Sequence, residues 1–470
     1  MKRVIFLLAF LTIFLVQQAF SFDWGGSVED KSIGNFTFDK FSSGYLIQTE
    51  IARLWMSQSF GGSADLLMKA NVADAITEGY APGPFSNTPT VDLDDLAFSS
   101  GGLVLGRTIY SDFGGVLLNT TLDGIQGTIS MQGLDLTLLA GYSGFVFKSG
   151  STMVISQADL TDRTVAEDFS KPSTLFAPPR AVGYLDANFT KLLPDQEVQL
   201  AEAVQIDLRQ SDIAKNGDSH SYYTPGSTAP VDMSYTGLGM SGRIVGPLYW
   251  DLWGYAGLGM SLTPTGNYAQ KVVDTTKQPA TVTPEVLQTW KTSYIVNGIG
   301  SLDFSLLLPD FYNTIVDLGL MVGSWDPDGI SPDQNLPTTP KGDTPSLYTG
   351  YFGISRTGSA LIFNPQPTNM AIAQLLYSLK PFSASKGDAA NLQMTASGFV
   401  FMRPTTGAIA ESGLDSTSKN LYLGTEADLN LIWRPAADWG ASLGLGLFAP
   451  GTAMTRGLEG IAQLGLNLSF

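Results

Sequence analysis

The chain has 470 residues, of which 44% are hydrophobic and 15% charged, and its mean hydropathy of +0.10 is too apolar for a disordered protein. The formal net charge of −17 argues against nucleic acid as a partner. The absence of cysteine excludes disulfides and thiolate sites. A single histidine leaves little for imidazole catalysis or metal binding, so we expect no cofactor.

The first 21 residues predict a secretory signal peptide. Lys2 and Arg3 precede an apolar run from Val4 to Val16, and Ala19-Phe20-Ser21 offers small residues for cleavage. The apolar run is shorter than the roughly 20 residues of a membrane-spanning helix. We expect one mature domain, residues 22–470, whose formal charge changes from −17 to −19 when Lys2 and Arg3 are removed.

The mature chain offers no run of about 18 apolar residues, so a bundle of membrane helices is excluded and a closed β-barrel is the alternative. Residues 22–95 are ambiguous and could hold two strands. The acidic stretch Asp92-Leu93-Asp94-Asp95 is interpreted as a solvated turn before a strand at Leu103, without a functional role.

Alternation of apolar and polar residues predicts strands in the middle of the chain. It runs over 248–260, 301–308 and 316–322, where leucine and valine alternate with aspartate, serine and glycine. Aromatic residues gather near the segment ends, as in the interfacial girdles of membrane barrels. These segments therefore have one face for lipid and one for water.

The C-terminal region gives the clearest pattern. Residues 421–434 and 439–448 alternate on either side of the turn 435–438 and predict a hairpin. Leu464, Leu466, Leu468 and Phe470 then alternate with small polar residues to the end of the chain. A final strand ending in phenylalanine is typical of the segment that the barrel-assembly machinery recognises, so we expect that machinery and outer-membrane lipid as partners.

Connections fall into two kinds, tight turns at 193–195, 246–247 and 309–311, and long polar segments at 150–180, 211–231, 263–291, 326–370 and 404–419. With Phe470 in the periplasm, strict alternation places every long segment outside, provided that 326–370 is one excursion containing residues 346–356. We predict an all-β, antiparallel, up-and-down transmembrane barrel of about 16 strands, within a range of 14 to 18, in the bacterial outer membrane.

Several segments resemble the alginate-export family of outer-membrane porins: Gly424 to Leu429 leading to Trp433-Arg434-Pro435, then Gly444 to Gly451; Leu105-Gly106-Arg107 with Leu122-Asp123-Gly124; and Ser324 to Gly329. The resemblance implies a monomeric barrel of about 16 to 18 strands that passes hydrophilic solutes. An alginate conduit needs a cationic lumen, and here the sequence departs from the family.

Seven charged residues fall on predicted water-facing positions and are candidates for the pore lining. They are Asp135, Asp251, Asp303, Asp317, Glu426, Asp428 and Arg434. This set favours cations or neutral sugars as solutes. The alternative is that Glu426, Asp428 and Arg434 form a structural network that braces the wall and lines no path.

Two further sites are weighed and set aside. Asp326, Asp328 and Asp333 could bind calcium, but their spacing is not that of an EF-hand loop, and plain turn chemistry of an exposed loop is the preferred interpretation. His220 lies between Ser219 and Ser221, which invites comparison with serine hydrolases. Neighbouring residues of an extended segment point to opposite sides, so neither serine meets the imidazole and no enzyme is expected.

The sequence therefore predicts a porin-like channel for passive diffusion of small hydrophilic solutes, with a mild preference for cations or neutral sugars. A surface-binding barrel, such as an adhesin whose long outer loops carry function, is the alternative. A lumen filled by bulky side chains would favour that alternative, whereas the glycine, serine, aspartate and asparagine residues on the inner faces favour the channel.

Overall fold

The computed structural model describes residues 23–38, 44–60, 64–79, 86–153, 155, 159, 167–168, 170–171, 174–209, 220–221, 231–274, 281–326, 347–355, 360–385, 387–407, 409–415 and 417–470. The predicted signal peptide lies outside them and stays a prediction. Within these ranges no helix is long and apolar enough to cross a membrane.

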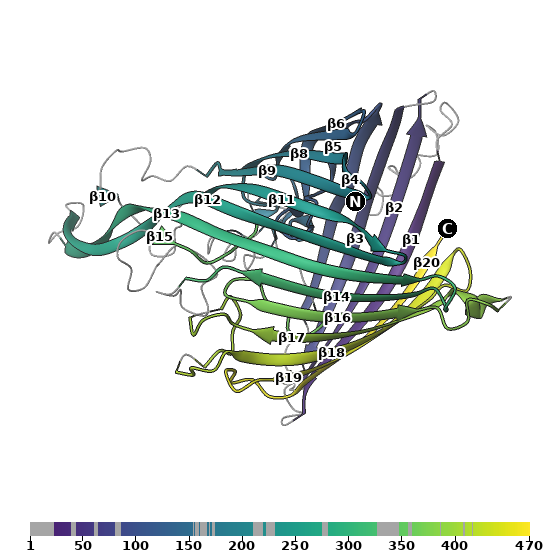
Figure 1. The fold of residues 1–470 in the computed structure, drawn as a ribbon. Helices are drawn as coiled ribbons and strands as arrows, with labels where there is room; N and C mark the ends of the chain where they lie inside the picture. The colour runs from purple at the N-terminus through teal and green to yellow at the C-terminus, as the bar shows by residue number, and fades with distance from the viewer. Residues whose placement is uncertain are drawn as a thin grey trace.

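The described strands form one sheet that closes on itself, and all strands of its wall pair antiparallel (Figure 1). Eighteen of them form the wall: β1 (Asp23–Thr37), β2 (Tyr45–Ser59), β3 (Ala64–Gly79), β4 (Ser86–Ser100), β5 (Leu103–Ser111), β6 (Asn119–Met131), β7 (Leu134–Tyr142), β8 (Arg180–Leu193), β9 (Gln196–Asp207), β11 (Asp232–Val245), β12 (Leu248–Asp274), β13 (Thr281–Leu308), β14 (Thr314–Gly323), β16 (Ala371–Leu379), β17 (Leu392–Met402), β18 (Tyr422–Trp433), β19 (Trp439–Pro450) and β20 (Glu459–Ser469). The short strands β10 (His220–Ser221) and β15 (Leu347–Tyr348) lie beside β13.

The first and last strands close the barrel. β1 pairs with β20 from Ser27 opposite Ser469 to Thr37 opposite Glu459. Gly26 and Phe470 exchange two backbone hydrogen bonds of 2.9 and 3.0 Å at the end of this seam. A closed sheet leaves no unpaired edge, which is the condition for a sheet to span a membrane. The prediction of an antiparallel barrel is confirmed, with eighteen strands instead of about 16.

The additional strands come from the region that alternation leaves ambiguous. Residues 23–100 form β1 to β4, and the stretch Asp92–Asp95 lies inside β4. The interpretation of that stretch as a solvated turn is therefore wrong. Asp94 accepts a hydrogen bond of 2.5 Å from Asn71, and Asp95 pairs with Lys69 at 3.3 Å, so polar partners on β3 hold these acids within a strand. A register shift at Lys69/Ala70 breaks the simple alternation.

The predicted long loop 263–291 is also wrong, because β12 continues to Asp274 and β13 begins at Thr281. Their backbones pair without interruption except for a bulge between Pro264 and Gly266. Figure 1 shows this hairpin extending beyond the other strands. The segment is rich in threonine and valine, which favour strands even when the residues are polar on average.

The lipid-facing and lumen-facing sides follow the predicted alternation in most strands. Leu464, Leu466 and Leu468 of β20 are 49–54% exposed on the outer face. The opposite face of β20 continues onto β19, where Gly446 is paired with Ile461. This face lies against residues 360–370, since a Cβ atom on Gly446 would be 3.3 Å from the Leu361 Cβ. The face that carries Gly446 is therefore the inside of the barrel.

One position departs from this pattern. Leu423 is fully buried in an inner cluster with Phe401 and Phe448, although alternation places it on the face of Thr425. The register with β17 shifts here, and Gly424 has a φ of +153°, a conformation that side chains with a Cβ rarely adopt. The bulge at Gly424 turns the preceding residue inward.

Candidate functional site

Three of the predicted acids lie together on the inner face of adjacent strands. Asp251 of β12 is directly opposite Asp303 of β13, and Asp317 of β14 is opposite Ser305, one inner-facing position along β13 from Asp303. The Ser301 hydroxyl donates a 2.8 Å hydrogen bond to Asp303. Asp251 is exposed and the other two are half-buried, so all three reach the water of the lumen. We call this set the acidic wall.

Asp135 lies on a different part of the inner face. It is opposite Ser130 of β6 and Asn188 of β8, near the tight turn between β6 and β7. Its neighbours on the same face are polar, as a hydrated surface requires. Alternation alone therefore assigns this aspartate, like the acidic wall, to the lumen side.

Glu426 and Asp428 of β18 make different contacts, although they too point inward. Glu426 is fully buried and accepts backbone hydrogen bonds from Ile362 at 2.7 Å and Phe363 at 2.8 Å. Asp428 is 6% exposed and accepts one from Leu361 at 3.2 Å. These contacts favour the bracing role for the two acids, because residues 361–363 cover them.

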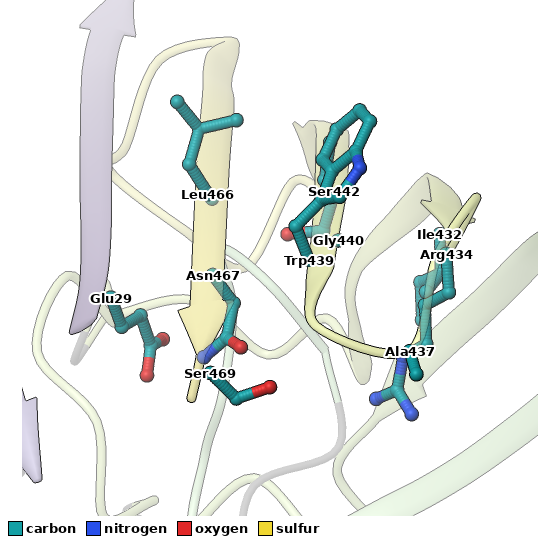
Figure 2. A pocket seen from close by; sticks show the side chains of 12 residues that line it. Glu29, Ile432, Arg434, Ala437, Trp439, Gly440, Ser442, Leu466, Asn467 and Ser469 are labelled. Atoms are coloured by element: carbon teal, nitrogen blue, oxygen red, sulfur yellow. The ribbon is translucent and has the colours of Figure 1, made fainter. Parts of the chain in front are cut away.

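Arg434, the third member of that predicted network, is separate from it. Its side chain is exposed, and it makes no ion pair with any residue that the structure describes. It contributes instead to a pocket of about 480 Å³ on the inner face, which also contains Glu29 and Asn467 (Figure 2). The sequence thus predicts the position of Arg434 on the water-facing side, but not its surroundings.

Basic residues occupy the opposite wall, which the sequence leaves unassigned. Lys31, Arg53 and Lys69 lie on β1, β2 and β3, about half the circumference away from β12 to β14. Arg53 pairs with Glu29 at 2.6 Å. We call Lys31, Arg53 and Lys69 the basic wall. The alternation of inward-facing and outward-facing residues would have predicted it from the sequence if β1 to β3 had been recognised as strands.

The connection from β5 to β6, residues 112–118, reaches into the lumen. The Asp112 carboxylate holds it, accepting hydrogen bonds from the backbone of Leu118 at 2.7 Å and Gly114 at 3.0 Å and from the Tyr255 hydroxyl at 2.8 Å. Phe113 stacks on the Tyr255 ring at 5.0 Å between ring centroids. Burial raises the pKa of Asp112, against the lowering effect of its hydrogen bonds. The connection that follows β5 therefore contacts Tyr255 of β12, although β5 and β12 are not neighbours in the barrel wall.

The long excursion between β14 and β16 packs on this connection. Ile354 and Ser355 donate backbone hydrogen bonds of 2.8 and 3.1 Å to the Leu117 carbonyl. The Tyr235 hydroxyl donates a 2.5 Å bond to the Phe352 carbonyl, which ties the segment to β11. Since β14 pairs directly with β16, the prediction that 326–370 is one excursion enclosing residues 346–356 is confirmed for the described residues 347–355.

A buried charged network fixes the connection between β7 and β8. Arg180 contacts Asp159 at 3.0 Å and Asp207 at 2.9 Å, and Arg209 contacts Asp159 at 2.9 Å and Asp207 at 2.5 Å. Both acids are fully buried at their side chains. The sequence gives no signal for this network, because Asp159 and Arg180 are far in the chain from Asp207 and Arg209 and only the fold brings the four residues together.

An apolar cluster joins the inward-folded connections to the wall. Its members from the connections, Leu117, Leu118, Met153, Ile155, Tyr348, Tyr351, Phe352 and Ile354, are buried together with inner-facing aromatic residues of the wall, among them Tyr184, Tyr235 and Trp253. A second cluster joins residues 363 and 370 to β17, β18 and β19. The side of the barrel that holds the tight turns and both chain ends keeps the polar inner face.

The two sites set aside from the sequence remain without support. No group of three or more histidine, cysteine, aspartate or glutamate residues suited to a metal ion occurs in the described ranges. Asp326 accepts a 3.2 Å backbone hydrogen bond from Thr349, while Asp328 and Asp333 lie outside those ranges. His220 is part of β10, whose backbone pairs with Thr289 and Gln288 of β13.

No family model and no curated protein matches the chain. Solved structures from Pseudomonas aeruginosa do match. OccK8 (OprE) has a TM-score of 0.52 at 11% identity and covers 96% of this chain and 98% of that chain. OccK7 (OpdD) has a TM-score of 0.50 at 9% identity, and OpdL has 0.50 at 11%, each covering 96% of this chain and 99% of that chain.

At such low identity the likeness establishes the fold alone, and the chain thus shares the closed-barrel fold of these structures. It does not support the alginate-export family specifically, so the resemblance of the quoted segments stays a prediction. One pair from those segments does meet in space, since Arg107 binds Asp123 through two hydrogen bonds of 2.9 and 2.8 Å.

Proposed function

We propose that the protein is a bacterial outer-membrane channel through which small hydrophilic solutes diffuse passively. The observation that carries the proposal is a closed barrel whose inner face is polar on the side of the tight turns and narrowed by inward-folded connections on the other. The predicted signal peptide agrees with this compartment. Contact with outer-membrane lipid and recognition of the Phe470 strand by the barrel-assembly machinery are part of the same proposal.

The acidic wall supports a preference for cations or neutral solutes. Asp251, Asp303 and Asp317 face the lumen, and no cationic side chain among the described residues lies within salt-bridge distance of them, whereas the opposite Arg53 and Lys69 are paired with Glu29 and Asp95. A low-dielectric wall focuses the field of unpaired acids into the lumen and raises the local concentration of cations. Asp135 adds a further negative charge. Neutral sugars would pass without this electrostatic preference.

The direct test of passive diffusion is swelling of liposomes that contain the purified mature protein. Neutral sugars of increasing size should enter at rates that fall steeply with solute size, because the connections 112–118 and 347–355 narrow the lumen. Proteoliposomes that swell no faster than protein-free liposomes with any sugar would contradict the proposal.

A surface-binding barrel remains the second candidate, because a cluster of aromatic and aliphatic side chains packs the inward-folded connections against the wall and the β12–β13 hairpin extends beyond the wall. In that case the outer segments would bind a partner and no solute would cross. Fast swelling excludes the filled lumen that this candidate requires.

A further inference from the structure

The pocket that contains Arg434 lies at the end of the barrel where β1 begins and β20 ends. Its walls come from β1, β18, β19 and β20 and from the turn between β18 and β19 (Figure 2). With about 480 Å³ it can hold a small organic solute. It is lined by hydroxyl, amide and charged groups and by glycine and alanine, while Ile432, Trp439 and Leu466 add apolar surface, so it suits a polar ligand with a short hydrocarbon part.

The strand register places its charged residues in one row. Arg434 follows Trp433, which is opposite Ala441, so Arg434 lies beside Gly440. Gly440 is opposite Asn467, and Asn467 is opposite Glu29. Figure 2 shows Arg434 and Glu29 at the two sides of the pocket with Asn467 between them. One cation, one amide and one carboxylate therefore span it in order.

Both charged ends have unused binding capacity. The Arg434 guanidinium makes no ion pair with a described residue, and Gly440 leaves room beside it, since a Cβ there would be 3.3 Å from the Arg434 Cγ. Glu29 contacts Arg53 at 2.6 Å through Oε2. Its second oxygen, Oε1, has no contact with Arg53, and a carboxylate oxygen accepts more than one donor. Lys31 lies one row further along β1, outside the lining.

The span suits one molecule carrying both charges. Three strand spacings separate Arg434 from Glu29, about 14 Å between backbones. The Arg434 and Glu29 side chains stand on the same inner face, so a small solute that carries both a carboxylate and an ammonium can contact both of them. A simple anion or a simple cation would satisfy only one end of the row.

We propose that this pocket is a subsite for small zwitterionic solutes, with the anionic group bound by Arg434 and the cationic group by Glu29, and with the Asn467 amide between them. The inference rests on the proposed channel function, since it names a solute class for the same lumen. Binding should be weak, because a subsite in a diffusion path must release its ligand readily.

The test is a ligand-observed NMR titration of the folded protein in detergent, which requires no conduction. The probe is 4-aminobutanoate, with butanoate and butylammonium as ligands of matched length that carry one charge each. We expect saturable binding of 4-aminobutanoate and at least about fivefold weaker binding of the other two. Equal affinity for butanoate would overturn the zwitterion subsite in favour of a plain anion site.

Variants locate the site. Arg434→Gln and Glu29→Gln should each weaken 4-aminobutanoate binding by about tenfold, the worth of one charge-assisted contact. Arg243→Gln is the matched control, because Arg243 is half-exposed near another tight turn and pairs with Asp195 at 3.1 Å. Heat-modifiable migration establishes that each variant is folded. Undiminished binding in both pocket variants would overturn the proposal.

The two proposals fail separately. A protein that admits solutes into liposomes but does not bind 4-aminobutanoate would overturn the subsite and leave the channel. A protein that binds the probe but admits no solute would overturn the channel and leave the pocket.

Discussion

At the scale of single residues, the inner acids divide into two kinds. Glu426 holds the connection between β14 and β16 by accepting the Ile362 and Phe363 backbone N–H groups. Glu426→Ala leaves two buried donors unsatisfied, at about 1–3 kcal/mol each. We expect a lower urea midpoint and faster proteolysis of that connection, with little change in ion selectivity.

Glu426→Gln is the matched variant, because it keeps one acceptor oxygen. It should fall between the wild type and Glu426→Ala in stability. A Glu426→Ala protein as stable and protease-resistant as the wild type would show that the contact does not hold the connection.

The acidic wall should govern selectivity instead. Replacing Asp251, Asp303 and Asp317 together by asparagine removes the unpaired charges that face the lumen, so the reversal potential in a salt gradient should move toward zero. Asp388→Asn changes the charge of an exposed turn and should leave that potential in place. Retention of full cation preference in the triple variant would place selectivity elsewhere.

Alternation could predict which residues point inward, because the two sides of a strand differ strictly by one position. It identified Asp135, Asp251, Asp303, Asp317 and Arg434 on this basis. It could not predict that residues 361–363 cover Glu426, since that contact joins positions more than 60 apart. Nor could it predict Leu423, because a bulge reverses the alternation.

At the scale of elements, the connection 112–118 is the segment that we expect to constrict the lumen. Asp112 holds it through Leu118, Gly114 and Tyr255. Asp112→Ala removes both carboxylate oxygens and with them all three hydrogen bonds, so the connection should be displaced from the lumen more often. We expect larger or noisier single-channel currents, whereas currents identical to the wild type would show that 112–118 does not narrow the path.

The stability of the connection 112–118 should also depend on pH, through the carboxyl group of Asp112. Burial raises the pKa of Asp112, so the inward-folded connection favours the protonated carboxyl relative to a state in which Asp112 meets water. Its stabilisation is complete below the ordinary carboxyl pKa and is lost as the pH rises through the raised value. Current noise should therefore increase with pH over that interval, and Asp112→Asn, which cannot ionise, should show no such change.

The extended part of the β12–β13 hairpin should be dispensable for the barrel. The wall pairing of β12 with β11 ends at Met260, and that of β13 with β14 ends at Ile299, so residues 263–274 of β12 and 281–291 of β13 lie beyond the wall. Their replacement by a short turn should preserve heat-modifiability and conductance. Loss of folding would show that the hairpin belongs to the barrel core.

Composition predicted a loop at 263–291 because the segment is polar on average. The prediction failed because two neighbouring strands can satisfy each other's backbone hydrogen bonds whatever their side chains. Tight turns were easier to predict. Pro309-Asp310-Phe311 and Gly246-Pro247 interrupt the alternation, and the structure has turns there between β13 and β14 and between β11 and β12.

At the scale of the whole molecule, the fold class followed from two features of the sequence. It has no long apolar helix segment after the predicted signal peptide, and it alternates up to its last residue. Neither fact fixes how far the outer connections fill the lumen, because that depends on contacts such as Arg180 with Asp159 and Asp207. The strand count was least certain where acids lie within strands, as in β4.

The central claim is that the lumen stays open, and single-channel recording in a planar bilayer under a salt gradient tests it most directly. The structure predicts stepwise ohmic currents with a reversal potential of the sign that favours cations. A folded, heat-modifiable protein that never conducts would contradict the channel and favour the surface-binding barrel.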